Sequence, residues 1–137
     1  MTFEDVMLEV SCHCSAIAIR LPRRPRVLTA CNCSMCVRVQ PLFAYYVART
    51  VSITAPDRAF ESYVWGKGKL RWYRCRTCGC FTHHHPVGHE TDLTQRTGVN
   101  LRLADVEALR GLEVKVRDGA ADTWKLIGTY RYGSGEG

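Results

Sequence analysis

The sequence predicts a mainly β fold in a single domain, residues 1–137. Most of its apolar segments alternate with a period of two, which is the spacing of strands rather than of helices. Short segments rich in glycine, proline or polar residues separate them, as turns separate strands. With 137 residues, of which 46% are hydrophobic, the chain has the size and composition of one folded domain.

The predicted strands follow one another along the chain. They cover residues 16–21, 27–30, 43–48, 51–54, 60–65, 70–74, 99–103 and 112–116. Residues 66–69, Gly-Lys-Gly-Lys, are typical of a hairpin turn between two of these strands. Only residues 103–109 favour a helix, of one or two turns, with Asp105 as its N-cap. The glycine-rich tail, residues 132–137, is expected to be mobile.

The N-terminal residues do not resemble an export signal. An acidic pair, Glu4-Asp5, stands where a signal peptide has basic residues, and no apolar segment follows it. No segment approaches the roughly 18 apolar residues of a membrane span. We therefore expect a soluble, cytoplasmic protein, and in that compartment cysteines stay reduced.

The eight cysteines form three tight clusters, each at a predicted strand end or turn. They are a C-x-C pair, a C-x-C-x-x-C triplet and a C-x-x-C-G-C triplet: Cys12, Cys14; Cys31, Cys33, Cys36; Cys75, Cys78, Cys80. Sulfurs this close in sequence converge on one metal ion more easily than they pair as disulfides. Thiolates favour zinc over magnesium or calcium, and iron–sulfur chemistry is the alternative. Spacing alone leaves open which cysteines share an ion.

These motifs resemble those of the glutathione-dependent formaldehyde-activating enzyme family, whose domain also occurs in centromere protein V. The matching segments are residues 11–14 (Ser-Cys-His-Cys), 31–36 (Cys-Asn-Cys-Ser-Met-Cys) and 73–79 (Tyr-Arg-Cys-Arg-Thr-Cys-Gly). Residues 98–102 and the dipeptide Asp118-Gly119 give weaker support. The resemblance extends over roughly residues 8–128, and its three motifs occur in the family's order.

The resemblance implies a β-tent fold of small antiparallel sheets with two zinc ions per chain. It implies a structural zinc held by Cys12, Cys14, Cys75 and Cys78. The site implicated in catalysis, a second zinc site, would use Cys31, Cys33 and Cys36. A closed structural zinc has four protein ligands and a catalytic zinc has three, which agrees with this division.

The family joins glutathione and formaldehyde into S-hydroxymethylglutathione, which is a carbon–sulfur lyase reaction in reverse. The implied function is a zinc-dependent carbon–sulfur lyase-type enzyme acting on a thiol–aldehyde adduct, with a small thiol such as glutathione as its partner. Three thiolates on Zn²⁺ suit binding a substrate thiol as thiolate, whose sulfur then attacks or releases an aldehyde carbon. The alternative is a non-catalytic, zinc-stabilised interaction module like the centromere protein V domain.

The charge of the chain gives little support to a nucleic-acid partner. Its formal net charge is +6, but seven metal-bound thiolates and two Zn²⁺ ions would lower it to about +3. The basic run at residues 20–26 contains two prolines and is expected to be an exposed turn, with a glutathione carboxylate or phosphate contact as the alternative. Arg71, Arg74 and Arg76 alternate with Trp72 and Tyr73, so a nucleic-acid stacking surface is retained as a weaker hypothesis. Homo-oligomerisation is compatible with the sequence.

Two features depart from this simple interpretation. Ser15 follows the first C-x-C pair, where the family often has glycine, and Cys80 stands where a small hydroxyl residue is usual. We expect Cys80 to be a buried thiol, the alternatives being an eighth metal ligand or a redox or substrate-side thiol.

On a strand, His83 and His85 share one face and His84 takes the other. We expect these rings to be partly exposed, with an acid–base role or a separate histidine metal site as alternatives.

Overall fold

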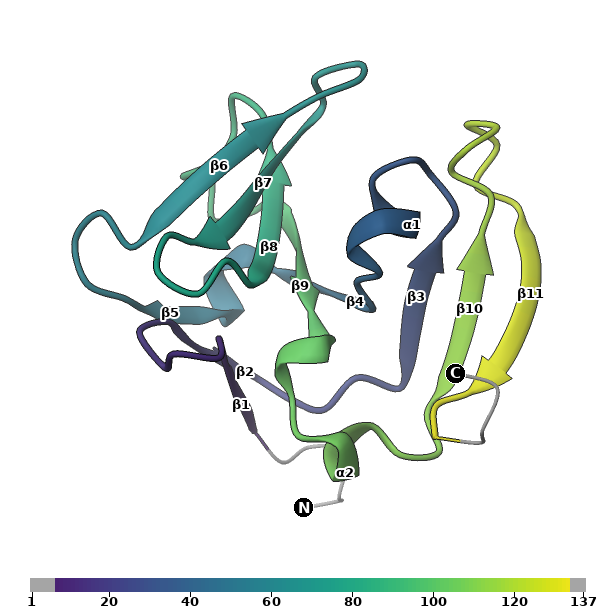
Figure 1. Ribbon diagram of the computed structural model, residues 1–137, viewed down its shortest axis with the longest axis horizontal. Coiled ribbons are helices and arrows are strands. Elements are labelled where there is room, and N and C mark those ends of the chain that lie inside the picture. Colours follow the sequence, from purple (N-terminus) through teal and green to yellow (C-terminus); the bar gives the residue numbers. More distant parts are fainter. Residues whose placement is uncertain (1–6, 134–137) are drawn as a thin grey trace.

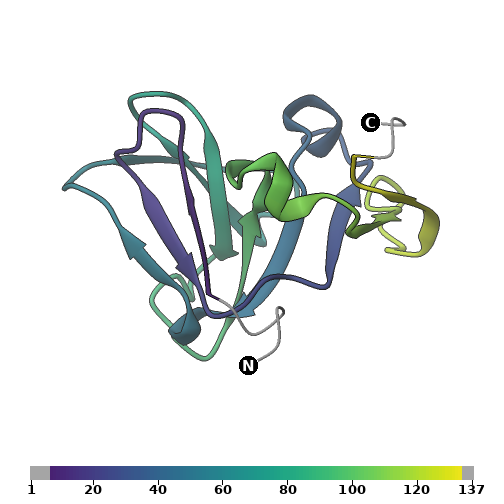
Figure 2. The same ribbon diagram turned by 90° about the horizontal axis from the view of Figure 1, so that it is seen from below.

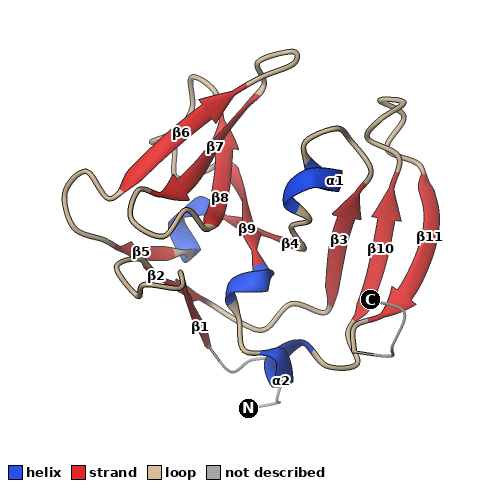
Figure 3. Ribbon diagram, viewed as in Figure 1, coloured by secondary structure: helices blue, strands red, loops and turns tan. Residues whose placement is uncertain are grey.

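The computed structural model describes residues 7–133 and consists mostly of short strands (Figure 3). Their bounds are β1 (Leu8–Ser11), β2 (Ala18–Leu21), β3 (Val27–Cys31), β4 (Phe43–Val47), β5 (Ser52–Thr54), β6 (Phe60–Val64), β7 (Leu70–Cys75), β8 (Phe81–Pro86), β9 (Arg96–Asn100), β10 (Glu113–Arg117) and β11 (Leu126–Arg131). The helical segments are α1 (Cys36–Val39), α2 (Val106–Leu109) and the 3₁₀ turns Ala48–Thr50 and Leu101–Leu103. The predicted mainly β fold is confirmed.

The strands form a small sheet and a large one. The small sheet has the order β1-β2-β5, and the large sheet has the order β11-β10-β3-β4-β9-β8-β7-β6. Neighbouring strands are antiparallel except for β3 and β10, which are parallel. Figure 2 shows the small sheet at one end of the molecule and β10–β11 at the other.

The large sheet bends sharply between β3 and β4. These strands are paired at a single position, Thr29 opposite Phe43, and they diverge beyond it. As a result β3, β10 and β11 form one wall and β6–β9 form another, with α1 between them (Figure 1). The large sheet therefore behaves as two smaller ones, which agrees with the small sheets that the resemblance implied.

Two buried clusters fill this framework. The main core contains alternate residues of the strands, for example Ile19, Leu28, Val99 and Val114, which are completely buried. A second cluster lies beneath α1 and consists of Cys36, Phe43, Trp72 and Phe81. The second cluster thus includes Cys36, the last cysteine of the C-x-C-x-x-C motif.

The sequence located most strands but missed several short elements. α2 covers the last four residues of the helix predicted over residues 103–109, and Asp105 is its N-cap residue, although the Asp105 side chain makes no capping hydrogen bond. β1, β8, β11 and α1 were not among the predicted elements. The strand predicted over residues 99–103 was shifted, because β9 covers Arg96–Asn100 and a 3₁₀ turn follows at Leu101–Leu103. The predicted mobile tail falls mainly on residues 134–137, outside the described residues. No helix in the described part of the chain has the length and apolar character needed to span a membrane.

Replacing Gly98 by alanine should destabilise the fold. Gly98 on β9 lies opposite His84 on β8, and a Cβ atom at Gly98 would lie 2.5 Å from His84 Nε2. We expect Gly98→Ala to lower the free energy of unfolding by about 1–3 kcal/mol, because the buried imidazole must move. Denaturant unfolding measures the change. Gly128→Ala on β11, where a Cβ meets nothing within 4 Å, is the control, and an equal loss in both variants would contradict this account.

Candidate metal centres

The first candidate metal centre is the four-cysteine group, Cys12, Cys14, Cys75 and Cys78. Its members come from two tight turns, one between β1 and β2 and one between β7 and β8. The Ser15 N–H donates to the Cys12 carbonyl at 3.0 Å, and the Gly79 N–H donates to the Cys75 carbonyl at 2.9 Å. Both donors have positive φ values, 66° for Ser15 and 81° for Gly79. The left-handed conformation of Ser15 explains why glycine suits that position.

The geometry of the four-cysteine group fits a zinc ion. All four sulfurs lie within 4.8 Å of one another. Cys14 Sγ is 3.7 Å from Cys12 Sγ and 3.6 Å from Cys75 Sγ. Tetrahedral zinc with Zn–S bonds of about 2.3 Å requires sulfurs about 3.8 Å apart. The Cys78 N–H also donates to Cys75 Sγ at 3.5 Å, which supports a thiolate there.

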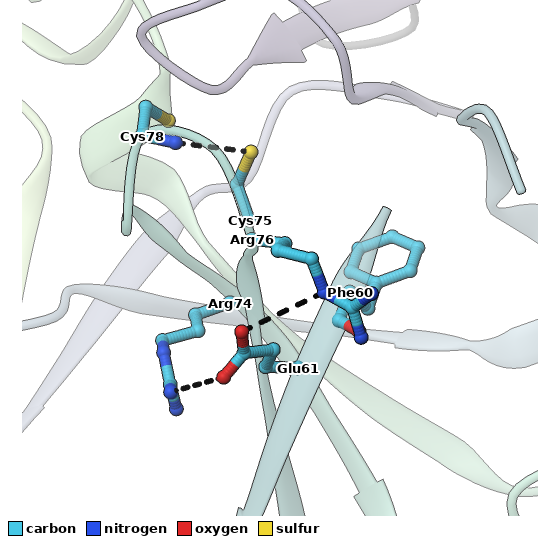
Figure 4. A network of polar contacts seen from close by, with 6 residues as sticks. All are labelled: Phe60, Glu61, Arg74, Cys75, Arg76 and Cys78. Carbon is cyan, nitrogen blue, oxygen red and sulfur yellow. Dashed lines mark hydrogen bonds and ion pairs between the residues drawn. The ribbon is translucent and has the colours of Figure 1, made fainter. Parts of the chain in front are cut away.

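Ion pairs and a hydrogen bond connect β6 to the residues on either side of Cys75 (Figure 4). Glu61 on β6 pairs with Arg74 at 2.7 Å and with Arg76 at 3.6 Å, and Arg76 also donates to the Phe60 carbonyl at 3.4 Å. Arg71 pairs with Glu90 at 3.0 Å. The arginines of the hypothetical nucleic-acid surface therefore have carboxylate partners, which weakens that hypothesis.

The second candidate centre is the cysteine triplet, Cys31, Cys33 and Cys36. Cys31 ends β3, Cys33 lies in the following turn, and Cys36 begins α1 and is buried. Their three sulfurs also lie within 4.8 Å of one another. The Cys33 N–H donates to Cys31 Sγ and the Cys36 N–H to Cys33 Sγ, both at 3.4 Å. Within residues 7–133, no fourth cysteine, histidine or carboxylate joins the triplet.

The triplet favours a thiolate at Cys31. A hydrogen bond from the Cys36 thiol is the largest cause that lowers the pKa of Cys31, to about 6. The same hydrogen bond, together with burial, raises the pKa of Cys36. One proton is thus held between two sulfurs, and a bound cation would displace it.

A loop after β10 supports the triplet. Asn32 Nδ2 donates to Asp118 Oδ1 at 3.0 Å, and Asn32 Oδ1 accepts from the Ala120 N–H at 2.8 Å. These bonds hold Gly119 against Cys31, so that a Cβ at Gly119 would lie 2.4 Å from Cys31 Sγ. The dipeptide Asp118-Gly119, which gave weaker support to the family resemblance, thus lies beside the triplet.

Gly119→Ala is expected to weaken metal binding at the triplet without unfolding the protein. The added methyl group must displace Cys31 Sγ, whereas the four-cysteine group is untouched. We expect a loss of metal affinity of about 10–100-fold, the usual effect of disturbing ligand support. Competition with a chromophoric chelator measures it, again with Gly128→Ala as control. Unchanged affinity in Gly119→Ala would show that Gly119 does not set the position of Cys31.

Two hollows lie along β3, and the smaller one borders the triplet. A cavity of about 220 Å³ is lined by Cys31 and Cys36 together with Asn32, Gln40 and Arg102. A larger cleft of about 420 Å³ opens where β3 and β4 diverge, and Arg23, Arg26, Tyr45 and Tyr46 are among its lining residues. Arg23 and Arg26 are exposed, as predicted for the basic run, and they also border this cleft. Arg24 in the same run is instead partly buried and donates to the Ala108 carbonyl.

Cys80 lies beside the four-cysteine group but outside it. It precedes β8 in the turn rather than sharing a strand with Cys78, and it is partly buried against the main core. Burial raises the pKa of Cys80, whereas the backbone N–H of Cys80 is the largest cause that lowers the pKa of Cys78 to about 5. All eight cysteines are free of disulfides.

The histidines lie on the predicted faces of the strand, but two of them are more buried than expected. His83 and His85 do share a face, with ring centroids 5.0 Å apart, and His84 packs on the other face against Phe43 at 4.8 Å. The predicted partial exposure was wrong for His83 and His84, which are 3% and 6% exposed. Aromatic rings on both sides bury them. Within residues 7–133, no histidine joins either cysteine group.

Acid should destabilise the protein through these buried rings. Burial lowers the pKa of His83 to about 3 and that of His84 to about 4, against about 6.5 in an unfolded chain. The unfolded chain therefore binds protons that the folded protein does not, and stability falls as the pH drops below about 6.5. We expect both rings to keep neutral-form NMR shifts at pH 5.5. Protonated-form shifts at that pH would contradict the prediction.

Known proteins are similar to the part of this chain that contains both cysteine groups. The family model for glutathione-dependent formaldehyde-activating enzyme matches residues 7–110, which contain both cysteine groups. The crystal structure of a Rhodobacter sphaeroides protein is similar, with a TM-score of 0.58, 25% sequence identity, and coverage of 72% of this chain and 88% of that chain. No curated protein matches the chain. This chain is a member of the glutathione-dependent formaldehyde-activating enzyme family.

Proposed function

We propose that this protein is a zinc-dependent carbon–sulfur lyase-type enzyme that forms or cleaves a thiol–aldehyde adduct such as S-hydroxymethylglutathione. Family membership supports a role with glutathione and formaldehyde. The observation that carries the proposal is the difference between the two cysteine groups, since four sulfurs converge at one and three at the other. A three-ligand site beside a cavity is the arrangement of a catalytic rather than a structural zinc.

The residues of the triplet would hold the second zinc, and the four-cysteine group would hold a structural zinc. Zinc bound at the triplet would supply a Lewis acid that favours a substrate thiol in its thiolate form. Asn32 holds the loop of Gly119 against Cys31, and Phe43 and Trp72 pack against Cys36. A cavity of about 220 Å³ lined by Cys31 and Cys36 suits the part of the thiol next to its sulfur, while the rest of a larger thiol would lie outside it.

The chemistry needs no further reactant. In the forward direction the thiol loses its proton and the sulfur forms a bond to the aldehyde carbon. The π electrons of the carbonyl group move to its oxygen, which takes up a proton, so the overall reaction is balanced. We place this activity in the cytoplasm, where reduced small thiols are abundant.

An exchange measurement tests the proposed activity. The zinc-loaded protein is added to glutathione and ¹³C-formaldehyde, and the rate of adduct formation and cleavage is followed by ¹³C exchange NMR. We expect a protein-dependent acceleration that heat-denatured protein does not give. No acceleration with glutathione or with cysteine-sized thiols would contradict the proposal.

An interaction module is the second candidate function. On the edge strand β11 and the turn before it, Trp124, Leu126 and Ile127 are each about half exposed. Apolar residues at an open sheet edge are typical of surfaces that meet another chain. A homo-oligomer formed through this edge remains part of this alternative. Loss of self-association in an Ile127→Lys variant, in a protein without exchange activity, would favour it.

A further inference from the structure

One row of residues crosses four strands on the face beneath α1. Tyr45 on β4 lies opposite Gly98 on β9, Gly98 lies opposite His84 on β8, and His84 lies opposite Trp72 on β7. These strands lie side by side in Figure 1. Because Gly98 has no side chain, the row has a gap between Tyr45 and His84.

The imidazole of His84 occupies this gap. A Cβ at Gly98 would lie 2.5 Å from His84 Nε2 and 2.6 Å from its Cε1, so the ring lies directly over Gly98. The ring centroids of Phe43, Trp72 and Tyr45 are 4.8, 5.7 and 6.2 Å from that of His84. Aromatic side chains and a glycine thus fix the position of one polar ring.

The Nδ1 atom of His84 is buried and makes no hydrogen bond to another residue in the described part of the chain. Its neighbour His83 is equally buried, but His83 Nδ1 is bonded to Thr82 Oγ1 at 2.8 Å. Buried polar atoms are nearly always paired, and an unpaired one is costly. An unpaired nitrogen that the fold holds in place is typical of a group whose partner is a ligand.

The His84 ring shares aromatic neighbours with the cysteine triplet. Phe43 and Trp72, which contact the His84 ring, are packed with Cys36 in the second buried cluster, and Cys31 and Cys33 lie at the border of that cluster. Burial is the largest cause of the raised pKa of Tyr45, and the electrostatic influence of the triplet also contributes to it. His84 and Cys36 are thus packed against the same two aromatic side chains, Phe43 and Trp72.

We propose that His84 is a substrate-binding residue whose Nδ1 hydrogen-bonds the oxygen of the thiol–aldehyde adduct. This inference rests on the proposed function and names the group that recognises the oxygen. A neutral imidazole can serve either form of the substrate, because its tautomers allow Nδ1 to donate to a carbonyl oxygen or accept from a hydroxyl group. In this arrangement the triplet site binds the sulfur of the adduct, and His84 hydrogen-bonds the oxygen of the same adduct.

A pair of stable ligands tests the inference with the full-length, zinc-loaded protein. S-(2-hydroxyethyl)glutathione and S-propylglutathione have the same length, but only the first has a hydroxyl group. We expect calorimetry to show about 10-fold tighter binding of the hydroxyl ligand, together with a change in the ¹⁵N shift of His84 Nδ1. His84→Phe, which keeps a ring over Gly98, should abolish the preference, and His84→Asn should keep part of it.

His85→Phe is the matched control, because it makes the same change one residue along on the opposite face. It should keep the ligand preference and the exchange rate, whereas His84→Phe should lower kcat/KM for adduct exchange by at least about 10-fold with its zinc content unchanged. No preference in the wild-type protein, or an undiminished preference in His84→Phe, would overturn the role of His84 while leaving the enzyme proposal intact. A wild-type protein that does not accelerate exchange would instead overturn the proposed function.

Discussion

Cys75→Ala is expected to prevent the protein from folding. Cys75 is 1% exposed, and its sulfur belongs to the group that joins the turn between β1 and β2 to the turn between β7 and β8. Structural zinc sites contribute on the order of 10 kcal/mol to folding, which equals the whole stability of many domains. Circular dichroism and the zinc content of the soluble fraction measure the effect, and we expect loss of folded protein.

Cys80→Ala is the control for this prediction. Cys80 is in the same turn, is partly buried and lies outside the four-cysteine group. Its replacement should cost no more than about 2 kcal/mol, the usual effect of truncating a partly buried side chain. A stably folded Cys75→Ala protein with full zinc content would show that folding does not depend on metal binding by the four-cysteine group.

Cys36→Ala is expected to abolish catalysis in a protein that still folds. It removes one of three ligands and the thiol that shares a proton with Cys31, while the four-cysteine group is intact. We expect the second zinc to be lost and adduct exchange to fall by at least about 100-fold. Elemental analysis and ¹³C exchange NMR measure the two effects on the same sample.

Val39→Ala provides the comparison, since Val39 is on the same helix but points toward solvent, with 38% of its surface exposed. It should retain both zinc ions and full exchange activity. Wild-type exchange in Cys36→Ala, with its metal content unchanged, would refute the assignment of the triplet as the reactive site.

Alternation located strands that bury one face, whereas β8, which is buried on both faces, and the exposed edge strand β11 were missed. Period-two alternation locates β2 because Ile19 and Leu21 are buried and Arg20 between them is exposed. β11 carries no such signal, since nearly all of its residues are exposed and it is paired along one edge only. α1 is a single helical turn and too short for a 3.6-residue pattern to appear.

The cysteine groups were predictable as clusters, but their surroundings were not. Spacing alone allows several combinations of cysteines, and the resemblance selected the two combinations whose sulfurs the structure brings together. The bond between Asn32 and Asp118 joins residues 86 positions apart, and the burial of His84 depends on Gly98 in the neighbouring strand. Such relations depend on strand register, which a local pattern does not contain.

The zinc content of the wild-type protein tests the central claim most directly. The claim is that one four-thiolate site stabilises the fold and one three-thiolate site remains accessible to a substrate thiol. Elemental analysis of untagged protein, purified without chelator, should give two zinc ions per chain, and mild chelation should remove one while the protein stays folded. A folded protein without zinc, or one whose two zinc ions resist chelation equally, would contradict the claim.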